Sequence, residues 1–306
     1  MSTLTPVTQA FADQSALNFV SGQSEHILGE VMNRAYPEIT YMRDIPVDTS
    51  APEWSSAVSF LSAGPVGQAA VIGGQGDDIP FANLTREKHS VGIQMAAIGY
   101  QFSLEEIGQA QMMGLDLSAD GAAAARKAYE QFMDDLAYSG HPQVGNGEGL
   151  YSLSSISSSA AATSWASVSN GDAILDDVNT LLSGILEDSK GIETADNLHV
   201  PLSIFGLLAR TRLSEHSDAT LLSHIAATNI FTAMTGQALT IRGDRRLKDK
   251  VIAYRKDPDV LRLHLPMALK FLEPRAENLH VTVPGMFRTS GLEVRSPGAI
   301  RQLTSV

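Results

Sequence analysis

Two long extended segments flank a glycine-rich turn in the first third of the sequence, and together they limit the folds open to the chain. The segments are residues 57–72, "AVSFLSAGPVGQAAVI", and 83–103, "NLTREKHSVGIQMAAIGYQFS", and the turn at 73–80 is "GGQGDDIP". This pattern predicts a large β-hairpin. A two-stranded hairpin is marginal on its own, so we expect this one to lie on another surface. Its large apolar residues are few: Phe60, Leu61, Val71, Ile72 and Phe81.

The strongest predicted helix covers residues 119–138 and ends before Gly140 and Pro142. Ser103 and Glu106 have capping-box spacing and predict a shorter helix before it, and residues 15–35 and 172–189 predict two more. Strands and helices then mix without regular βαβ alternation, which indicates an α+β fold. The apolar residues of the strongest helix recur at i, i+3/i+4 and i+7: Ala122, Ala125, Tyr129, Phe132, Met133 and Leu136.

The same helix carries a candidate metal or acid/base site. Glu130 and Asp134 share a face at i, i+4, and Asp135 and His141 follow them. A metal would require a second helix with a matching acidic or histidine pair, or a motif such as H-E-x-x-H, and the sequence has neither. We therefore interpret these four residues as the solvated face of a structural helix.

Other catalytic signals are equally weak. The glycine-rich "GNGEG" at 145–149 carries an acid where a phosphate-binding loop would avoid one, which favours a flexible connection. The serine-rich run at 151–170 has no base beside it and predicts a surface loop or short polar strands. We predict no catalytic, cofactor-binding or metal-binding residue, no cofactor and no enzyme activity. The eight histidines show no ligand spacing: His26, His89, His141, His199, His216, His224, His264 and His280.

The composition of the chain excludes several kinds of site and of protein. The 306-residue chain contains no cysteine, which excludes disulfides and zinc–thiolate sites. Residues 1–19 have no basic segment followed by an apolar run, and no window approaches the roughly 20 apolar residues that span a bilayer. We expect no signal peptide, no membrane partner and a cytosolic chain.

Charge is unevenly distributed along the chain. Residues 240–306 contain 13 Lys/Arg and 7 Asp/Glu, whereas residues 1–239 contain 9 and 27. Two interpretations of this asymmetry stay open. The charges can belong to solvated faces, or copies of the chain can meet head to tail with an acidic surface against a basic one. A nucleic-acid reader fits less well, because the net charge of −12 is repelled by phosphate. On the head-to-tail interpretation, residues 242–250 ("RGDRRLKDK") meet an acidic face of a neighbouring subunit.

Three passages carry a resemblance to a known family. Residues 251–274, "VIAYRKDPDVLRLHLPMALKFLEP", and 283–303, "VPGMFRTSGLEVRSPGAIRQL", closely resemble one subgroup of phage and prophage capsid proteins. The middle passage, "IGYQFSLEEIGQAQMMGLDL" with "AAAARKAYEQFMDDLAYSG", resembles their spine helix and its exit. The likeness covers nearly the whole chain and is to the Hong Kong 97-type major capsid protein of tailed bacteriophages.

The resemblance implies a Hong Kong 97-type fold with four parts. These are an N-terminal arm (1–50), an extended β-hairpin loop (51–97), a peripheral domain with a long spine helix (98–148 and 266–297), and an axial α/β domain (149–265 and 298–306). It implies a self-assembling structural protein that forms hexamers and pentamers of an icosahedral head around double-stranded DNA. The partners are then other copies, with scaffold, portal and decoration proteins, in a virion assembled in the bacterial cytoplasm.

The resemblance also raises the question of covalent welding. The archetype joins subunits by an isopeptide bond from a lysine in the extended loop, but residues 55–86 contain no lysine here. The first lysine, Lys88, lies beside Glu87 and His89, and an exposed ammonium next to an acid is a poor nucleophile. We therefore expect a non-covalent shell. Two alternatives stay open: an encapsulin-type nanocompartment shell, and a soluble α/β enzyme that uses the serine-rich run or Asp134 and Asp135.

Overall fold

The computed structural model describes residues 37–66, 81, 83–113, 117–162, 164–165, 171–213 and 219–306. The chain divides into two compact units, Met1–Glu38 and Ile39–Val306, and the second contains every helix and strand of the described residues. The helix expected at 15–35 and the turn expected at 73–80 lie outside the described residues. Within those ranges, no helix has the length and apolar character needed to cross a membrane.

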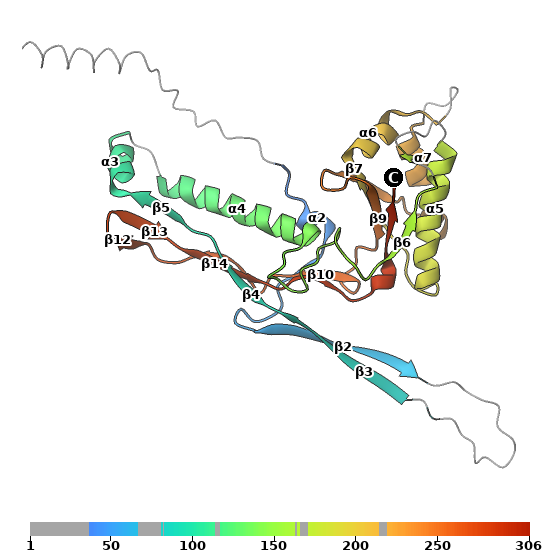
Figure 1. Cartoon of the computed structure of the whole chain (residues 1–306), viewed down its shortest axis with the longest axis horizontal. Coiled ribbons are helices and arrows are strands. Elements are labelled where there is room, and N and C mark those ends of the chain that lie inside the picture. Colours follow the sequence, from blue (N-terminus) through green and yellow to red (C-terminus); the bar gives the residue numbers. More distant parts are fainter. Residues whose placement is uncertain are drawn as a thin grey trace, which may run out of the picture. The chain divides into compact units, whose positions relative to one another are not determined.

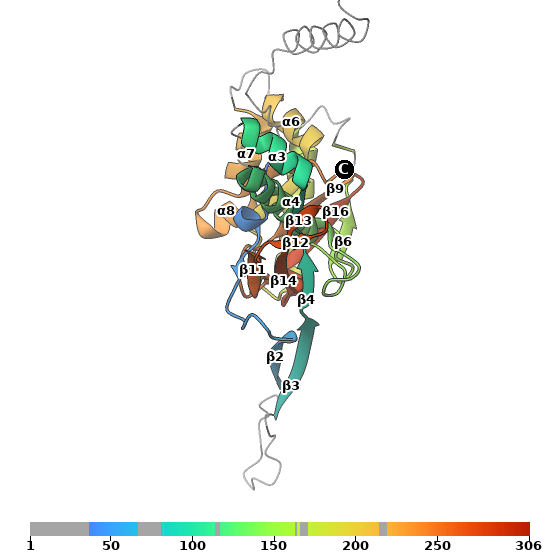
Figure 2. The same cartoon turned by 90° about the vertical axis from the view of Figure 1, so that its left-hand side faces the viewer.

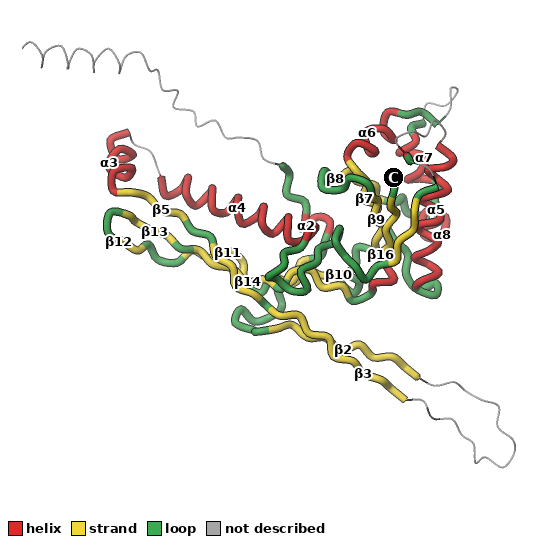
Figure 3. Tube along the Cα trace, in the orientation of Figure 1, coloured by secondary structure: helices red, strands yellow, loops and turns green. Residues whose placement is uncertain are grey.

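Helices and strands alternate irregularly along the second unit (Figure 3). The helices are α2 (Tyr41–Asp44), α3 (Leu104–Met113), α4 (Leu117–Ser139), α5 (Gly171–Asp188), α6 (Leu202–Arg210), α7 (Leu221–Ala227) and α8 (Ile230–Thr235), with a 3-10 turn at Pro297–Ala299. The first eight strands are β1 (Val47–Asp48), β2 (Ala57–Val66), β3 (Asn83–Gly92), β4 (Gln94–Ala97), β5 (Tyr100–Ser103), β6 (Ser157–Ala160), β7 (Asn197–Pro201) and β8 (Thr240–Asp244). The others are β9 (Lys250–Tyr254), β10 (Leu261–His264), β11 (Met267–Phe271), β12 (Arg275–Glu277), β13 (His280–Val283), β14 (Gly285–Thr289), β15 (Gly291–Val294) and β16 (Ile300–Thr304).

The predicted hairpin is confirmed for residues 57–66 and 83–92. Its second arm is shorter than predicted, because residues 94–97 and 100–103 form β4 and β5, which pair with β14 and β13 instead. Strands β2 and β3 pair antiparallel from Ala57 opposite Gly92 to Val66 opposite Asn83, and they lie side by side in both views (Figures 1 and 2). Leu61 is 66 % exposed and Phe81 is 88 % exposed. The hairpin therefore presents apolar side chains to its surroundings while forming a two-stranded sheet of its own.

A first core forms between helix α4 and the strands beside it. Tyr129 of α4 meets Phe287 of β14 edge-on, with ring centroids 4.8 Å apart, and Met133 is fully buried. The predicted apolar stripe of this helix is therefore the packing face. The capping box is also confirmed, since Ser103 N donates to Glu106 Oε2 at 2.8 Å and Glu106 N donates to Ser103 Oγ at 3.2 Å.

A second core forms around a five-stranded sheet with the order β6-β16-β9-β7-β8. Helices α5 to α8 pack with this sheet, and their buried residues form one apolar cluster with those of β7 and β9. Trp165 lies fully buried in this cluster, and its Nε1 donates to Asp177 Oδ2 at 2.9 Å. The serine-rich run contributes a short polar strand, β6, which pairs parallel with β16.

Candidate functional site: a buried polar junction

The structure places the four acid and histidine residues of α4 and its exit in four different environments. Asp135 is exposed, and Glu130 accepts a hydrogen bond from Tyr41 Oη at 2.9 Å. His141 Nδ1 accepts from Gln143 N at 3.3 Å. Asp134 is only 1 % exposed, so our interpretation of it as part of a solvated face is wrong. Its buried carboxylate belongs to a network that sequence periodicity did not indicate.

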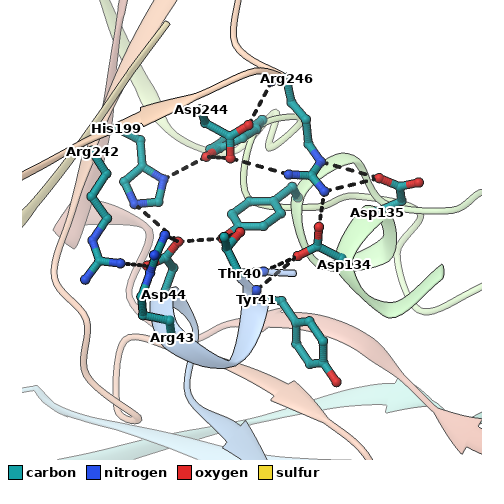
Figure 4. A network of polar contacts seen from close by, with 12 residues as sticks. Thr40, Tyr41, Arg43, Asp44, Asp134, Asp135, His199, Arg242, Asp244 and Arg246 are labelled. Atoms are coloured by element: carbon teal, nitrogen blue, oxygen red, sulfur yellow. Dashed lines mark hydrogen bonds and ion pairs between the residues drawn. The ribbon is translucent and has the colours of Figure 1, made fainter. Parts of the chain in front are cut away.

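Asp134 joins α4 to two distant segments (Figure 4). Its Oδ1 accepts from the backbone N–H groups of Thr40, at 2.9 Å, and Tyr41, at 3.0 Å. Its Oδ2 pairs with the guanidinium of Arg246, which comes from the loop between β8 and β9. The carboxylate therefore satisfies the otherwise unpaired donors at the start of α2 and balances a partly buried cation.

Asp44, at the end of α2, is the second buried carboxylate of the network. Its Oδ1 pairs with Arg242 at 2.7 Å and with Arg43 at 3.1 Å, and its Oδ2 accepts from Tyr138 Oη at 2.7 Å. Arg242 lies on β8 and Tyr138 on α4. Asp44 thus links helix α4 of the first core to strand β8 of the second core.

The centre of the network is His199 on β7, which is 1 % exposed. Its Nδ1 lies 2.7 Å from Tyr151 Oη, and its Nε2 lies 3.2 Å from Tyr254 Oη. Tyr151 Oη also contacts Asp244 Oδ2 at 2.9 Å, and Tyr254 Oη donates to the carbonyl oxygen of Asp44 at 3.0 Å. We call the whole set the polar junction: Thr40, Tyr41, Asp44, Asp134, Tyr138, Tyr151, His199, Arg242, Asp244, Arg246 and Tyr254.

Burial controls ionisation throughout the polar junction. It raises the pKa of Tyr138, Tyr151 and Tyr254, and the neighbouring carboxylates of Asp44 and Asp244 add to this effect. The three phenols therefore remain protonated hydrogen-bond donors at neutral pH. For Arg246, burial opposes the charged form, but Asp134 and Asp244 outweigh it and raise the pKa. Arg246 therefore keeps its positive charge beside these two acids.

The described residues contain no group of three or more histidines, aspartates and glutamates placed to hold a metal ion. The glycines of "GNGEG" have a backbone role instead. Gly145 and Gly147 adopt positive φ of 57° and 78°, and a Cβ on Gly145 would collide with the carbonyl oxygen of Ser290. This segment forms a tight turn at the exit of α4.

The basic segment at 242–250 behaves differently from our expectation. Arg242 pairs with Asp44, and Arg246 pairs with Asp134 and stacks 4.8 Å over the Tyr138 ring. These two cations therefore contact acids of their own chain, and the prediction that the whole segment meets a neighbouring subunit is wrong for them. Arg245 and Lys248 are exposed.

The sequence analysis missed Asp44, Tyr151, His199 and Tyr254 as members of one network. His199 and Tyr254 lie in apolar strands, where a single polar residue gives no periodic signal. For His199 and Tyr254, the available signal was a polar side chain within a mostly apolar strand, "NLHVP" for β7 and "KVIAY" for β9.

The model of the major capsid protein family matches residues 67–306. The chain belongs to the major capsid protein family. The expected resemblance to a capsid protein is thereby confirmed, and the chain is a structural component of a capsid. A comparison with curated proteins finds no match.

Solved structures show the same fold at low identity. The capsid of Myoviridae phage XM1 matches with a TM-score of 0.80 at 19 % identity, covering 94 % of this chain and 98 % of that chain. The capsid of an empty GTA particle matches with a TM-score of 0.63 at 12 % identity, covering 92 % of this chain and 94 % of that chain. A virus-like particle from Pyrococcus furiosus matches with a TM-score of 0.53 at 16 % identity, covering 86 % of this chain and 91 % of that chain. The predicted α+β, Hong Kong 97-type capsid fold is confirmed.

Proposed function

We propose that this major capsid protein assembles with copies of itself into hexamers and pentamers of an icosahedral phage head that encloses double-stranded DNA. The observation that carries the proposal is the hairpin β2–β3. Its ten residue pairs form a separate two-stranded sheet, and Leu61 and Phe81 are largely exposed. A hairpin with little core of its own gains stability when it lies across a neighbouring subunit.

The proposal includes a division of the chain into four parts: the arm (1–50), the extended loop (51–97), the peripheral domain (98–148 and 266–297) and the axial domain (149–265 and 298–306). The separate two-stranded sheet of the hairpin and the second apolar cluster, which lies within residues 161–306, support the extended loop and the axial domain as separate parts. We propose that the chain acts as a structural protein without enzyme activity, and that the polar junction holds the two cores in a fixed relation.

Scaffold, portal and decoration proteins are proposed partners, with assembly in the bacterial cytoplasm. A scaffold protein separate from residues 1–306 is expected to assist assembly. Uniform full-sized shells from the chain expressed alone would contradict that expectation.

Electron microscopy of the expressed protein tests the assembly proposal. Deletion of residues 62–80 removes the second half of β2 and the residues that follow it, and should leave a folded, soluble subunit that forms no closed shells. Normal shells from this deletion would show that the hairpin is not an intersubunit clamp. Shells that enclose protein cargo rather than DNA would support the encapsulin-type alternative.

A further inference from the structure

His199 lies in a chain of four polar contacts, and the protons available to these contacts can be counted. The contacts join Asp244 Oδ2 to Tyr151 Oη (2.9 Å), Tyr151 Oη to His199 Nδ1 (2.7 Å), His199 Nε2 to Tyr254 Oη (3.2 Å) and Tyr254 Oη to Asp44 O (3.0 Å). Each contact requires one proton between its two atoms to be a hydrogen bond.

Two of these contacts fix the direction of the others. The carbonyl oxygen of Asp44 can only accept, so Tyr254 donates its single hydroxyl proton to it. His199 Nε2 must then donate to Tyr254 Oη. A neutral imidazole has one proton, which leaves His199 Nδ1 as an acceptor.

The remaining proton cannot satisfy both contacts of Tyr151. If Tyr151 donates to the carboxylate of Asp244, its oxygen faces the lone pair of His199 Nδ1 at 2.7 Å. If it donates to Nδ1, its oxygen faces the carboxylate of Asp244 at 2.9 Å. With neutral His199, four contacts share three protons.

We propose that His199 and Tyr151 form a proton-operated relay: protonation of His199 turns the Tyr151 hydroxyl from His199 to Asp244 and completes all four hydrogen bonds. The relay rests on the proposed function, because it would regulate how firmly the polar junction holds the two cores of the shell subunit. The imidazolium donates from both nitrogens, and its charge lies 4.0 Å from Asp44 Oδ2.

The surroundings of His199 set the pH range of the relay. Burial is the largest influence and lowers the pKa of His199, the acids Asp44 and Asp244 oppose this, and Arg43 adds to it. The neutral form therefore prevails at pH 7, and the added proton enters below the usual value of 6.5. The titratable and charged groups that face the ring, from every element around it, are Arg43 and Asp44 of α2, Tyr138 of α4, Tyr151 of the following loop, Arg242 and Asp244 of β8, and Tyr254 of β9.

Nitrogen-15 NMR of the full chain labelled at histidine tests the relay, with magic-angle spinning so that assembled and unassembled chains can both be read. We expect the His199 ring to be neutral with the proton on Nε2 at pH 7, and both ring nitrogens to carry protons in acid. A ring that already carries both protons at pH 7, or one that stays neutral until the subunit unfolds, would overturn the proposal.

Two variants test the relay: the first also removes the charge of Asp244, which itself raises the pKa of His199, and the second leaves that charge in place. Asp244→Asn places an amide donor at Tyr151 Oη, so four protons are present with neutral His199, and the midpoint of its titration should fall by about one pH unit or more, a tenfold change in proton affinity. Tyr151→Phe removes the hydroxyl that turns, and should lower the midpoint similarly. An unchanged midpoint in both folded variants would refute the relay.

The result can be read independently of the proposed function. A chain that forms no shells but shows the expected titration contradicts the assembly proposal and leaves the relay standing. If shells form but the His199 ring does not titrate, the assembly proposal stands and the relay is refuted.

Discussion

Replacing Asp134 by alanine should destabilise the subunit severely, although helix periodicity alone would place this residue on the exposed side of α4. The change removes the acceptor of two backbone N–H groups, those of Thr40 and Tyr41, and the charge that faces Arg246. The Arg246 side chain is only 12 % exposed, so water cannot replace the lost partner fully.

The magnitude follows from the burial of the pair. Breaking a buried ion pair by removal of one partner costs about 3–5 kcal/mol, because the remaining charge stays desolvated. Arg246 keeps contacts with Asp135 at 3.4 Å and Asp244 at 3.5 Å, which favours the lower half of that range. At about 2 °C per kcal/mol for a chain of this size, a cost of about 3–4 kcal/mol should lower the melting temperature by about 6–8 °C. Asp134→Asn keeps an acceptor for the two N–H groups and should lower the melting temperature by less.

Thermal unfolding of the unassembled chain, followed by circular dichroism, measures this effect without a contribution from subunit contacts. The matched control is Asp135→Ala, one residue along the same helix. Asp135 is 68 % exposed, so its contact with Arg246 should contribute about 0–1 kcal/mol and the melting temperature should fall by about 2 °C or less. Equal, small shifts in the two alanine variants would refute the argument that the Asp134 carboxylate anchors α2 and Arg246.

Three further predictions concern pH, assembly and covalent bonding. Burial opposes ionisation of Glu293, but His264 and Arg295 outweigh it and lower the pKa below 4.5. The ionised Glu293 therefore stabilises the fold fully above about pH 4.5, and this stabilisation is lost as the pH falls. The difference in melting temperature between wild type and Glu293→Gln should be constant from about pH 5 to 7 and shrink in acid. A difference that grows in acid would contradict the lowered pKa of Glu293. Reversal of the exposed Arg245 to Glu should impair assembly, scored by sedimentation, while circular dichroism of the subunit stays unchanged; unaltered shells would mean that Arg245 makes no intersubunit ion pair. Boiled particles should run on a denaturing gel as one band near 32.7 kDa, because Lys88 is exposed on β3, and a ladder of oligomers would show that a covalent weld forms.

Local patterns in the sequence predicted the elements that depend on local physics. The apolar stripe of α4 needs only helix periodicity, and the structure extends the helix by a few residues to Leu117–Ser139. The capping box of α3 needs only the spacing of Ser103 and Glu106. The hairpin needs only extended residues around a turn, and its described pairs have the expected antiparallel register.

The polar junction could not be predicted in this way, because its partners are far apart in sequence. Asp134 and Arg246 are separated by 112 residues, and Asp134 and Thr40 by 94. Helix periodicity assigns Asp134 to the side away from the apolar stripe, and this is correct geometrically. The error was to treat that side as solvent, when the start of α2 and the loop after β8 cover it.

The long sequence separations also bear on why charged groups are kept at this position. Contacts between segments so far apart carry an entropic cost of loop closure, which the two apolar cores help to offset. A buried set of carboxylates and guanidiniums is weak support for stability, since apolar replacements of similar size are often as stable. Its directional hydrogen bonds, however, accept one arrangement of α2, α4 and the second sheet, whereas apolar packing tolerates small shifts. A subunit that must match its neighbours on several sides needs that single arrangement more than it needs additional free energy of folding.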